Sequence, residues 1–179
     1  MLDLTPEQFT KKVAENSIKI KKLIEKELPI TIGKEAVEHF KLNFQNQGWE
    51  RQGWPEVKRR QATWDRGDKS VNNPMFSRNR HGELLKKQKA GTRRPILTGE
   101  TGDLGRSIHP NPQNGVVTIT ADAKSEKGFG YAAVHNDGLK AGRGKGFIMP
   151  KRQFIGESET LNKKITDIIE DKITIILSK

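Results

Sequence analysis

The sequence contains no cysteine and no run of apolar residues that approaches the length of a membrane span. Without cysteine, the chain cannot form disulfide bonds, thiolate nucleophiles or cysteine-ligated zinc sites. The first residues, MLDLTPEQF, carry early carboxylates where a signal peptide would need an apolar run. We therefore expect a soluble protein of cytosolic origin that has no membrane partner.

Apolar and aromatic residues are scarce as well. Hydrophobic residues make up 32% and aromatic residues 6% of the 179 residues, against 31% charged residues. A chain of this length can bury one ordinary core, but it is short for two domains. We predict a single domain over residues 1–179, with a modest core and long polar segments.

Positive charge, in contrast, is abundant and unevenly placed. The net charge is +11, and residues 51–95 alone carry 13 basic and 4 acidic side chains, whereas residues 1–50 carry eight of each. A second basic segment, residues 136–156, has five basic side chains and one acidic one. Both segments lack hydrophobic periodicity, so we expect loops of positive potential that project from a nearly neutral body.

Residues 1–48 are predicted to form a helical hairpin. The stretch TPEQ at residues 5–8 combines a capping hydroxyl, a proline in the first turn and an amide side chain three residues after the cap. Apolar residues then recur at helical spacing as far as Pro29, which is expected to end the first helix. A second amphipathic helix should follow and stop near Gly48.

Residues 49–94 are predicted to be an extended basic segment that contains Trp49, Trp54 and Trp64. These tryptophans can pin the segment onto the body, because such large rings need to be buried against something. Alternatively, aromatic rings among cations can stack on nucleic-acid bases or fill a pocket of a partner. The basic residues that we expect to face DNA or a partner are Lys58, Arg59, Arg60, Arg143 and Lys145.

Residues 95–156 are predicted to form a small antiparallel sheet of three to four strands. A first strand near Ile108 leads into the turn HPNPQNG, and residues 116–121 alternate as a half-buried strand does. Residues 129–134 are apolar enough for a third, central strand. The glycine-rich stretch 136–148 is expected to be a mobile loop.

Residues 157–179 are predicted to form a C-terminal amphipathic helix that packs on the sheet. Isoleucines recur there at helical spacing, and acidic residues at the start suit the helix dipole. The predicted fold class is therefore α+β, with a helical hairpin, a small sheet, a covering helix and long basic loops.

The stretch YAAVHNDG places His135, Asn136 and Asp137 in a row, which raises the question of catalysis. On a strand, consecutive side chains point to opposite faces, so Asn136 could not share a face with the other two. No second motif stands at a spacing that would complete a catalytic triad. We expect residues 136–138 to form a turn, with His135 as a contact residue, and we expect no enzymatic activity.

Metal and phosphate sites receive little support. The four histidines show no paired spacing typical of a metal site. The stretch GRGKG at residues 142–146 shares only its glycine content with a phosphate-binding loop, because no serine or threonine follows Lys145. We expect no metal and no cofactor.

Three stretches that follow one another in the second half of the chain carry a family resemblance: RPILTGETGDLGRSI at 94–108, YAAVHNDG at 131–138 and MPKRQFIG at 149–156. In their order before a terminal amphipathic helix they resemble the phage virion morphogenesis family of tailed bacteriophages and prophages. The residues that correspond are Ile96, Leu97, Thr101, Gly102, Leu104, Ser107, Ile108, Tyr131, Ala132, His135, Gly138, Pro150, Arg152, Phe154, Ile155 and Gly156.

The resemblance covers roughly residues 94–179 and implies a structural protein that completes the tail or joins head and tail. It implies a homo-oligomer, such as a ring, whose partners are other virion proteins of the neck and tail. Its location would be the virion and, during assembly, the cytoplasm of the bacterial host. The residues expected at interfaces are Trp49, Trp54, Trp64, Tyr131, His135, Arg152 and Phe154.

A second hypothesis is a basic module that binds nucleic acid. Its motivation is the segment 51–95, where a net charge of +9 is interleaved with tryptophan. The two hypotheses are compatible if basic loops make non-specific contacts with DNA in a channel of the particle.

Overall fold

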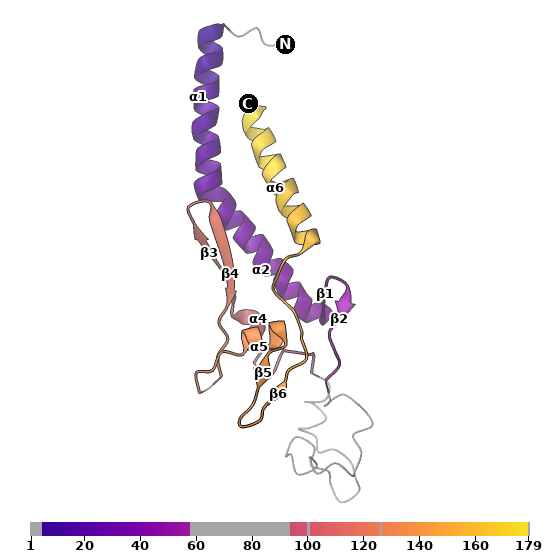
Figure 1. Ribbon diagram of the computed structural model, residues 1–179. Coiled ribbons are helices and arrows are strands. Elements are labelled where there is room, and N and C mark those ends of the chain that lie inside the picture. The colour runs from indigo at the N-terminus through magenta and orange to yellow at the C-terminus, as the bar shows by residue number, and fades with distance from the viewer. Residues whose placement is uncertain (1–4, 58–93, 100, 126, 179) are drawn as a thin grey trace, which may run out of the picture. The chain divides into compact units, whose positions relative to one another are not determined.

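The computed structural model describes residues 5–57, 94–99, 101–125 and 127–178. These residues belong to two compact units, and each unit is described by itself. The first comprises Met1–Leu42, Ser107–Ala121 and Ile155–Lys179, and the second comprises Asn43–Arg106 and Asp122–Phe154. Helices and small antiparallel sheets occur together, which confirms the α+β class (Figure 1). The single domain expected for residues 1–179 stays a prediction.

The N-terminal helices begin as the sequence predicts. Helix α1 spans Pro6–Lys22, and Thr5 caps it. The backbone N–H of Gln8 donates to Thr5 Oγ1 at 3.3 Å, and the N–H of Thr5 donates to Gln8 Oε1 at 3.0 Å. These reciprocal bonds form a capping box, which satisfies backbone donors that the first turn leaves open.

The predicted helical hairpin is wrong. A π-helical segment, Leu23–Glu27, leads directly from α1 into α2, Leu28–Asn46, so that the three segments form one long helical run (Figure 1). The N–H of Leu28 donates to the carbonyl of Leu23, five residues earlier. This wider turn lies just before Pro29, whose ring would clash with the carbonyl four residues before it in a regular helix. The π turn thus lets the chain pass Pro29 without ending the helix.

One β-hairpin of the first unit confirms the turn that the sequence predicts. Strand β3, Ile108–Gln113, pairs antiparallel with β4, Val116–Ala121. Asn114 and Gly115 connect them with φ values of 41° and 82°, as the tight hairpin turns require. The stretch HPNPQ, expected as part of the turn, instead forms most of β3. A two-stranded sheet leaves one edge of each strand unbonded, so prolines can occupy positions whose N–H would face that open edge.

The predicted third strand at residues 129–134 is wrong. Residues Ala132–Asp137 form the short helix α5, and before it only an isolated bridge joins Lys124 to Gly130. Gly138 ends the helix in the left-handed conformation, with φ at 71°. Alanine favours helix, and a short apolar run fits either element, so tertiary context decided the outcome here.

The strands of the described residues pair in three separate two-stranded sheets, which corrects the predicted sheet of three to four strands. In the second unit, β1, Gly48–Trp49, pairs with β2, Gln52–Gly53, and β5, Lys140–Ala141, pairs with β6, Phe147–Ile148. The predicted loop 136–148 therefore contains the end of α5 and a small hairpin. One turn of helix, α4, spans Asp103–Arg106 ahead of β3.

Helix α6, Glu159–Leu177, confirms the predicted C-terminal helix. The N–H of Leu161 donates to the capping Ser158 Oγ at 3.2 Å. The helix does not pack on a sheet, as predicted, but lies along α1 in the first unit (Figure 1). Ser158 Oγ also lies 3.0 Å from His39 Nε2 in α2, and Lys164 forms an ion pair with Glu35. The apolar stripe of α6 thus faces the N-terminal helices, which carry a matching stripe.

Candidate functional site

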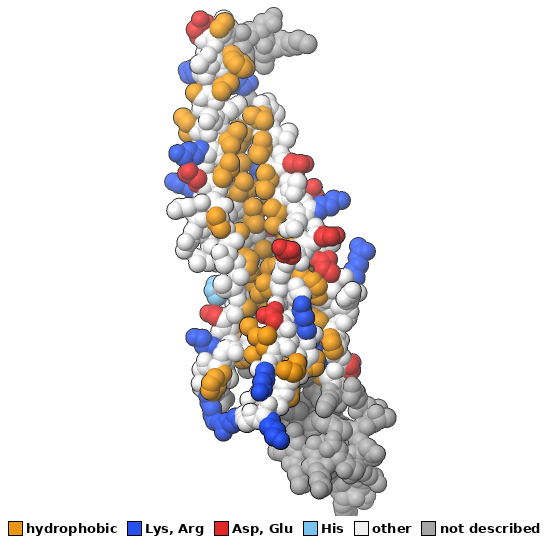
Figure 2. All heavy atoms as spheres, viewed as in Figure 1, with side chains coloured by type: hydrophobic (Ala, Val, Ile, Leu, Met, Phe, Trp, Pro, Cys, Tyr) orange, Lys and Arg blue, Asp and Glu red, His pale blue; other side chains and the backbone are white. Residues whose placement is uncertain are grey.

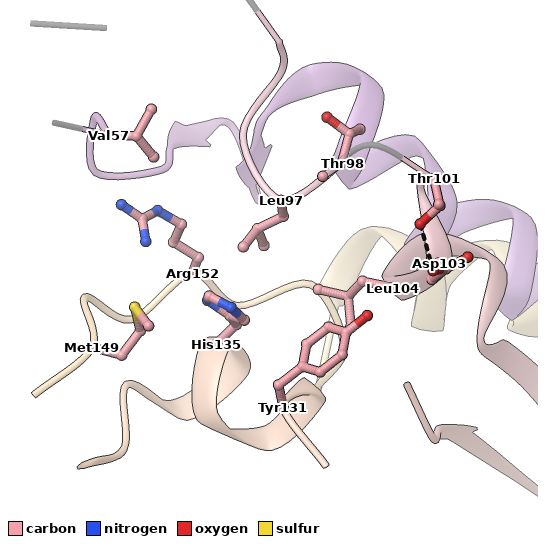
Figure 3. Close-up of a pocket in the computed structure, with 11 residues that line it drawn as sticks. Val57, Leu97, Thr98, Thr101, Asp103, Leu104, Tyr131, His135, Met149 and Arg152 are labelled. Carbon is pink, nitrogen blue, oxygen red and sulfur yellow. Dashed lines mark hydrogen bonds between the residues drawn. The ribbon is translucent and has the colours of Figure 1, made fainter. Parts of the chain in front are cut away.

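The second unit contains a pocket of about 420 Å³. Its walls come from the chain around Thr98, from α4, from α5 and from the segment after β6 (Figure 3). Its lining residues are Val57, Leu97, Thr98, Gly99, Thr101, Asp103, Leu104, Tyr131, His135, Met149 and Arg152.

Helix α5 brings Tyr131 and His135 together at this pocket. Tyr131 occupies the position just before the first helical residue, and His135 follows four residues later, so both side chains lie on one helical face. Their ring centroids are 6.2 Å apart, in an edge-to-face arrangement with an interplanar angle of 86°. The helix thereby presents two aromatic rings with polar ends to the pocket (Figure 3).

Arg152 forms another wall and is buried. Its Nε donates to the carbonyl of Pro55 at 3.0 Å and its Nη2 to the carbonyl of Glu56 at 3.5 Å. Its backbone N–H donates to the carbonyl of His135 at 2.8 Å. A guanidinium is a fork of donors without an acceptor, so backbone carbonyls are suitable partners for it. Arg152 therefore ties residues 55–56 to the end of α5.

The imidazole of His135 is held in its neutral form. Burial lowers the pKa of His135 below its usual 6.5, and the positive charge of Arg152 lowers it further. Its Nδ1 is buried and makes no hydrogen bond with any residue that the structure describes. A neutral imidazole can both donate and accept a hydrogen bond, but the lowered pKa makes it a weak base.

Asp103 stays ionised at the exposed side of the pocket. Hydrogen bonds from the side chains of Thr101 and Arg106 lower its pKa, and Arg106 Nη2 lies 2.8 Å from Asp103 Oδ1. Burial raises the pKa of the Tyr131 phenol, and the Asp103 charge raises it further, so this hydroxyl keeps its proton. Both the carboxylate and the phenol are therefore in their ordinary forms at neutral pH.

The two threonine hydroxyls of the pocket donate to groups other than His135. Thr98 Oγ1 donates to the carbonyl of Pro95 at 2.7 Å, and Thr101 Oγ1 donates to Asp103. A nucleophilic hydroxyl is normally activated by a hydrogen bond to a base such as histidine. Neither Thr98 nor Thr101 is therefore placed as a nucleophile that His135 activates.

Three of the residues that the sequence predicts at interfaces are buried inside the second unit. Trp54 Nε1 donates to the carbonyl of Gln153 at 2.7 Å, and the Trp54 ring packs edge-on against Phe44 at 5.5 Å between centroids. Phe154 is 1% exposed and its ring lies 5.2 Å from that of Phe44. With Arg152, these side chains hold the unit together, so Trp54 fits the interpretation in which tryptophan pins the chain to the body.

The other predicted residues are placed as follows. Tyr131 and His135 line the pocket, Trp49 lies half-buried in β1, and the side chains of Arg143 and Lys145 are exposed between β5 and β6. The predicted residues Trp64, Lys58, Arg59 and Arg60 lie outside the described residues.

Sequence reasoning missed several residues of the pocket. It does not predict Thr101 and Asp103 as site residues, although the spacing of TGDLGR would allow Asp103 to bond Arg106 across one helical turn. Val57 and Met149 carry no local signal at all. Whether these two residues reach the pocket depends on how segments distant in the sequence pack together.

Neither a metal site nor a membrane span is visible in the described part of the chain. Within it, no three His, Asp or Glu side chains gather as metal ligands would. The helices described there include none whose length and hydropathy would suffice to cross a membrane.

A comparison with protein families gives a match to the phage virion morphogenesis family over residues 78–174. The match spans more than half of the 179 residues and contains all three stretches on which the resemblance rests. Neither a curated protein nor a solved structure matches the chain. On the strength of the family match, which also includes ten of the eleven residues that line the pocket, the chain belongs to the phage virion morphogenesis family.

Proposed function

We propose that this protein is a structural component that completes the phage tail or joins the head to the tail. The observation that carries the proposal is the family match over residues 78–174, since a virion morphogenesis protein works together with other virion proteins. The protein acts as a homo-oligomer at the neck or tail end of the particle. It is made in the cytoplasm of the host and ends in the virion.

The chemistry of the pocket supports a structural role rather than an enzymatic one. His135 is a weak base because its pKa is lowered, and Thr98 and Thr101 donate their protons to other groups. Arg152 is committed to the carbonyls of Pro55 and Glu56. The positions and hydrogen bonds of these residues are explained by packing, without a catalytic role.

The pocket is the contact site for a neighbouring virion protein in this proposal. Leu97, Leu104 and Met149 provide apolar walls, and the buried Nδ1 of His135 can exchange a hydrogen bond with a hydroxyl or amide side chain. Pockets of this kind fix a partner by apolar packing plus a few placed polar groups. An inserted side chain of that chemistry would also satisfy the imidazole.

Deletion of the gene from the phage or prophage that encodes it tests the proposal. Electron microscopy of the particles is expected to show separate heads and tails, or tails with defective ends, and infectivity should be lost. Supplying the wild-type protein from a plasmid should restore both. Normal infectious virions from the deletion would refute the proposed role.

A second candidate function is non-specific binding of DNA, which the charge of residues 51–95 and the exposed Arg143 and Lys145 favour. Binding of duplex DNA should weaken with salt, by roughly 0.9 in log affinity per log salt for each phosphate neutralised. Measurable affinity at physiological salt would support this function. Affinity that vanishes there would leave only the attraction expected of any basic protein.

A further inference from the structure

Helices α1 and α6 of the first unit form an antiparallel pair with an open apolar side. The start of α1 and the end of α6 lie at the same end of this unit (Figure 1). Although residues 6–22 of α1 are all described, none of them is buried. In α6, which is described over residues 159–177, Leu161 alone is buried. The pair therefore has little core of its own, in contrast to α2.

Both helices nevertheless carry an apolar stripe. Phe9, Val13 and Ile20 recur on one face of α1, and Ile165, Ile169 and Ile176 recur on one face of α6. We call these six residues the α1/α6 seam. Phe9 is 59% and Val13 is 51% exposed, and the other four are half-buried. Figure 2 shows hydrophobic side chains gathered in a column along the two helices.

Two helices cannot bury such stripes by themselves. Each apolar stripe is about 100° wide, and a pair of helices covers only the line along which they touch. A four-helix bundle closes the remaining side, since every stripe then faces a common core. The helices α1 and α6, with 17 and 19 residues, are of matched length, as half of such a bundle would be.

The charges of the two helices indicate what completes the bundle. Helix α1 carries five lysines and two glutamates, whereas α6 carries four acidic residues and three lysines. A second copy related by a two-fold axis can place its α6 against α1 and its α1 against α6, so that unlike net charges meet. Pairing of α1 with α1 would instead bring like charges together.

Two polar residues interrupt the stripes at central positions. Asn16 lies between Val13 and Ile20, and Lys172 lies between Ile169 and Ile176; both side chains are half-buried. A single polar residue in an apolar seam costs stability but specifies the register and the number of helices that associate. Such residues are expected in a helical interface that admits one partner.

We propose that the α1/α6 seam is a self-association surface, through which two copies of this chain form a four-helix bundle. The inference rests on the proposed function, because it assigns a surface to the oligomerisation included there. The contact is two-fold and makes a pair. A head-to-tail ring would require a second surface on each copy.

Sedimentation velocity of the full chain over a series of concentrations tests the seam. The wild-type protein is expected to reach the mass of two chains, with a population of pairs that rises with concentration. The variants Val13→Glu and Ile169→Glu should lose the pair and sediment as single chains, because each puts a charge into the closed core. Circular dichroism should show wild-type helix content, since neither side chain is buried in the single chain.

Ile18→Glu is the matched control. Ile18 is a β-branched residue of the same helix, it is 71% exposed, and helical geometry places it opposite the stripe. This variant should pair as the wild type does. A wild-type protein that stays a single chain at all concentrations would overturn the inference, as would wild-type pairing by Val13→Glu or an equally weakened pairing by Ile18→Glu. A single chain that instead binds a different virion protein through Val13 would also overturn it.

The mass measurement and the deletion experiment can each refute one hypothesis without refuting the other. A monomeric wild-type protein refutes the seam, while the particles made without the gene still decide the role in tail completion. Normal virions from the deletion refute that role even if the protein pairs in solution.

Discussion

The indole N–H of Trp54 donates a hydrogen bond of 2.7 Å to the backbone carbonyl of Gln153, across 99 positions of sequence. The bond joins the segment that follows β2 to the segment that precedes Phe154. Asn43 Nδ2 donates to the carbonyl of Phe154 at 3.1 Å, so a second buried donor holds the same stretch of chain. Side-chain donors thus satisfy backbone carbonyls where the chain runs without regular structure.

Replacing Trp54 should destabilise the second unit, and by more with alanine than with phenylalanine. Trp54→Phe keeps a ring but removes the donor, and the unsatisfied carbonyl of Gln153 should cost about 1–3 kcal/mol. Trp54→Ala also leaves a cavity beside Phe44 and should cost about 3–5 kcal/mol. Urea unfolding measures both. Phe129→Ala is the control, because Phe129 is 71% exposed and its replacement should change the free energy of unfolding by less than about 0.5 kcal/mol. Equal costs at the two positions would contradict the buried role of Trp54.

Gly138 should not tolerate alanine. Its φ is 71°, where a residue with Cβ is strained by about 1–2 kcal/mol. The added Cβ would also lie 3.0 Å from the backbone nitrogen of Lys151 and from the carbonyl oxygen of Met149, which is closer than ordinary van der Waals approach. Thermal unfolding of Gly138→Ala should show a lowered Tm. Gly130→Ala is the matched control, because open space surrounds that position, and its Tm should stay near that of the wild type.

The features that the sequence predicts correctly depend on neighbouring residues. Thr5 and Gln8 specify a capping box, and Asn114 and Gly115 specify a tight turn. In each case, the side chain or the backbone conformation acts within four residues. Such local signals do not depend on the rest of the fold.

The features that sequence reasoning misses depend on packing between distant segments. The stretch of residues 129–134 is short and apolar, so its pattern does not distinguish a strand from a helix. The packing of α5 decides between the two. The π turn before Pro29 allows the helix to continue, although a proline in the interior of a helix usually ends it. Similarly, the motif YAAVHNDG draws attention to His135, but Arg152 stands 17 positions later in the sequence. That its charge acts on the imidazole could not be deduced from the motif.

The neutral state of His135 should make the stability of the protein depend on pH. Its pKa in the folded protein is lowered below 6.5, so the unfolded chain binds more protons between these two values. The free energy of unfolding should therefore fall as the pH drops through 6.5 toward the lowered pKa, and it should be fully regained above 6.5. Denaturant unfolding at a series of pH values measures this dependence.

His135→Gln is the variant that isolates this effect. Glutamine keeps a polar side chain but does not titrate, so the contribution of position 135 to the pH dependence should disappear. The other histidines are present in both proteins, and their contribution cancels in the difference. A variant whose stability falls with pH as steeply as that of the wild type would show that His135 is not responsible.

The basic stretch Lys58, Arg59 and Arg60 decides between binding of DNA and binding of protein. If these side chains neutralise phosphates, replacing all three with alanine should reduce the salt slope of duplex binding by about 0.9 for each phosphate that is no longer neutralised. Phage that carry the triple variant should retain or eject DNA poorly, while sedimentation shows the oligomer intact. Lys26, Lys34 and Lys41 provide the control, because they are exposed outside α1 and α6 and their replacement by alanine removes the same charge from a different segment. Equal changes in slope from both triple variants would indicate a general effect of net charge, and dissociation of the oligomer in the Lys58–Arg60 variant alone would assign these residues to protein binding.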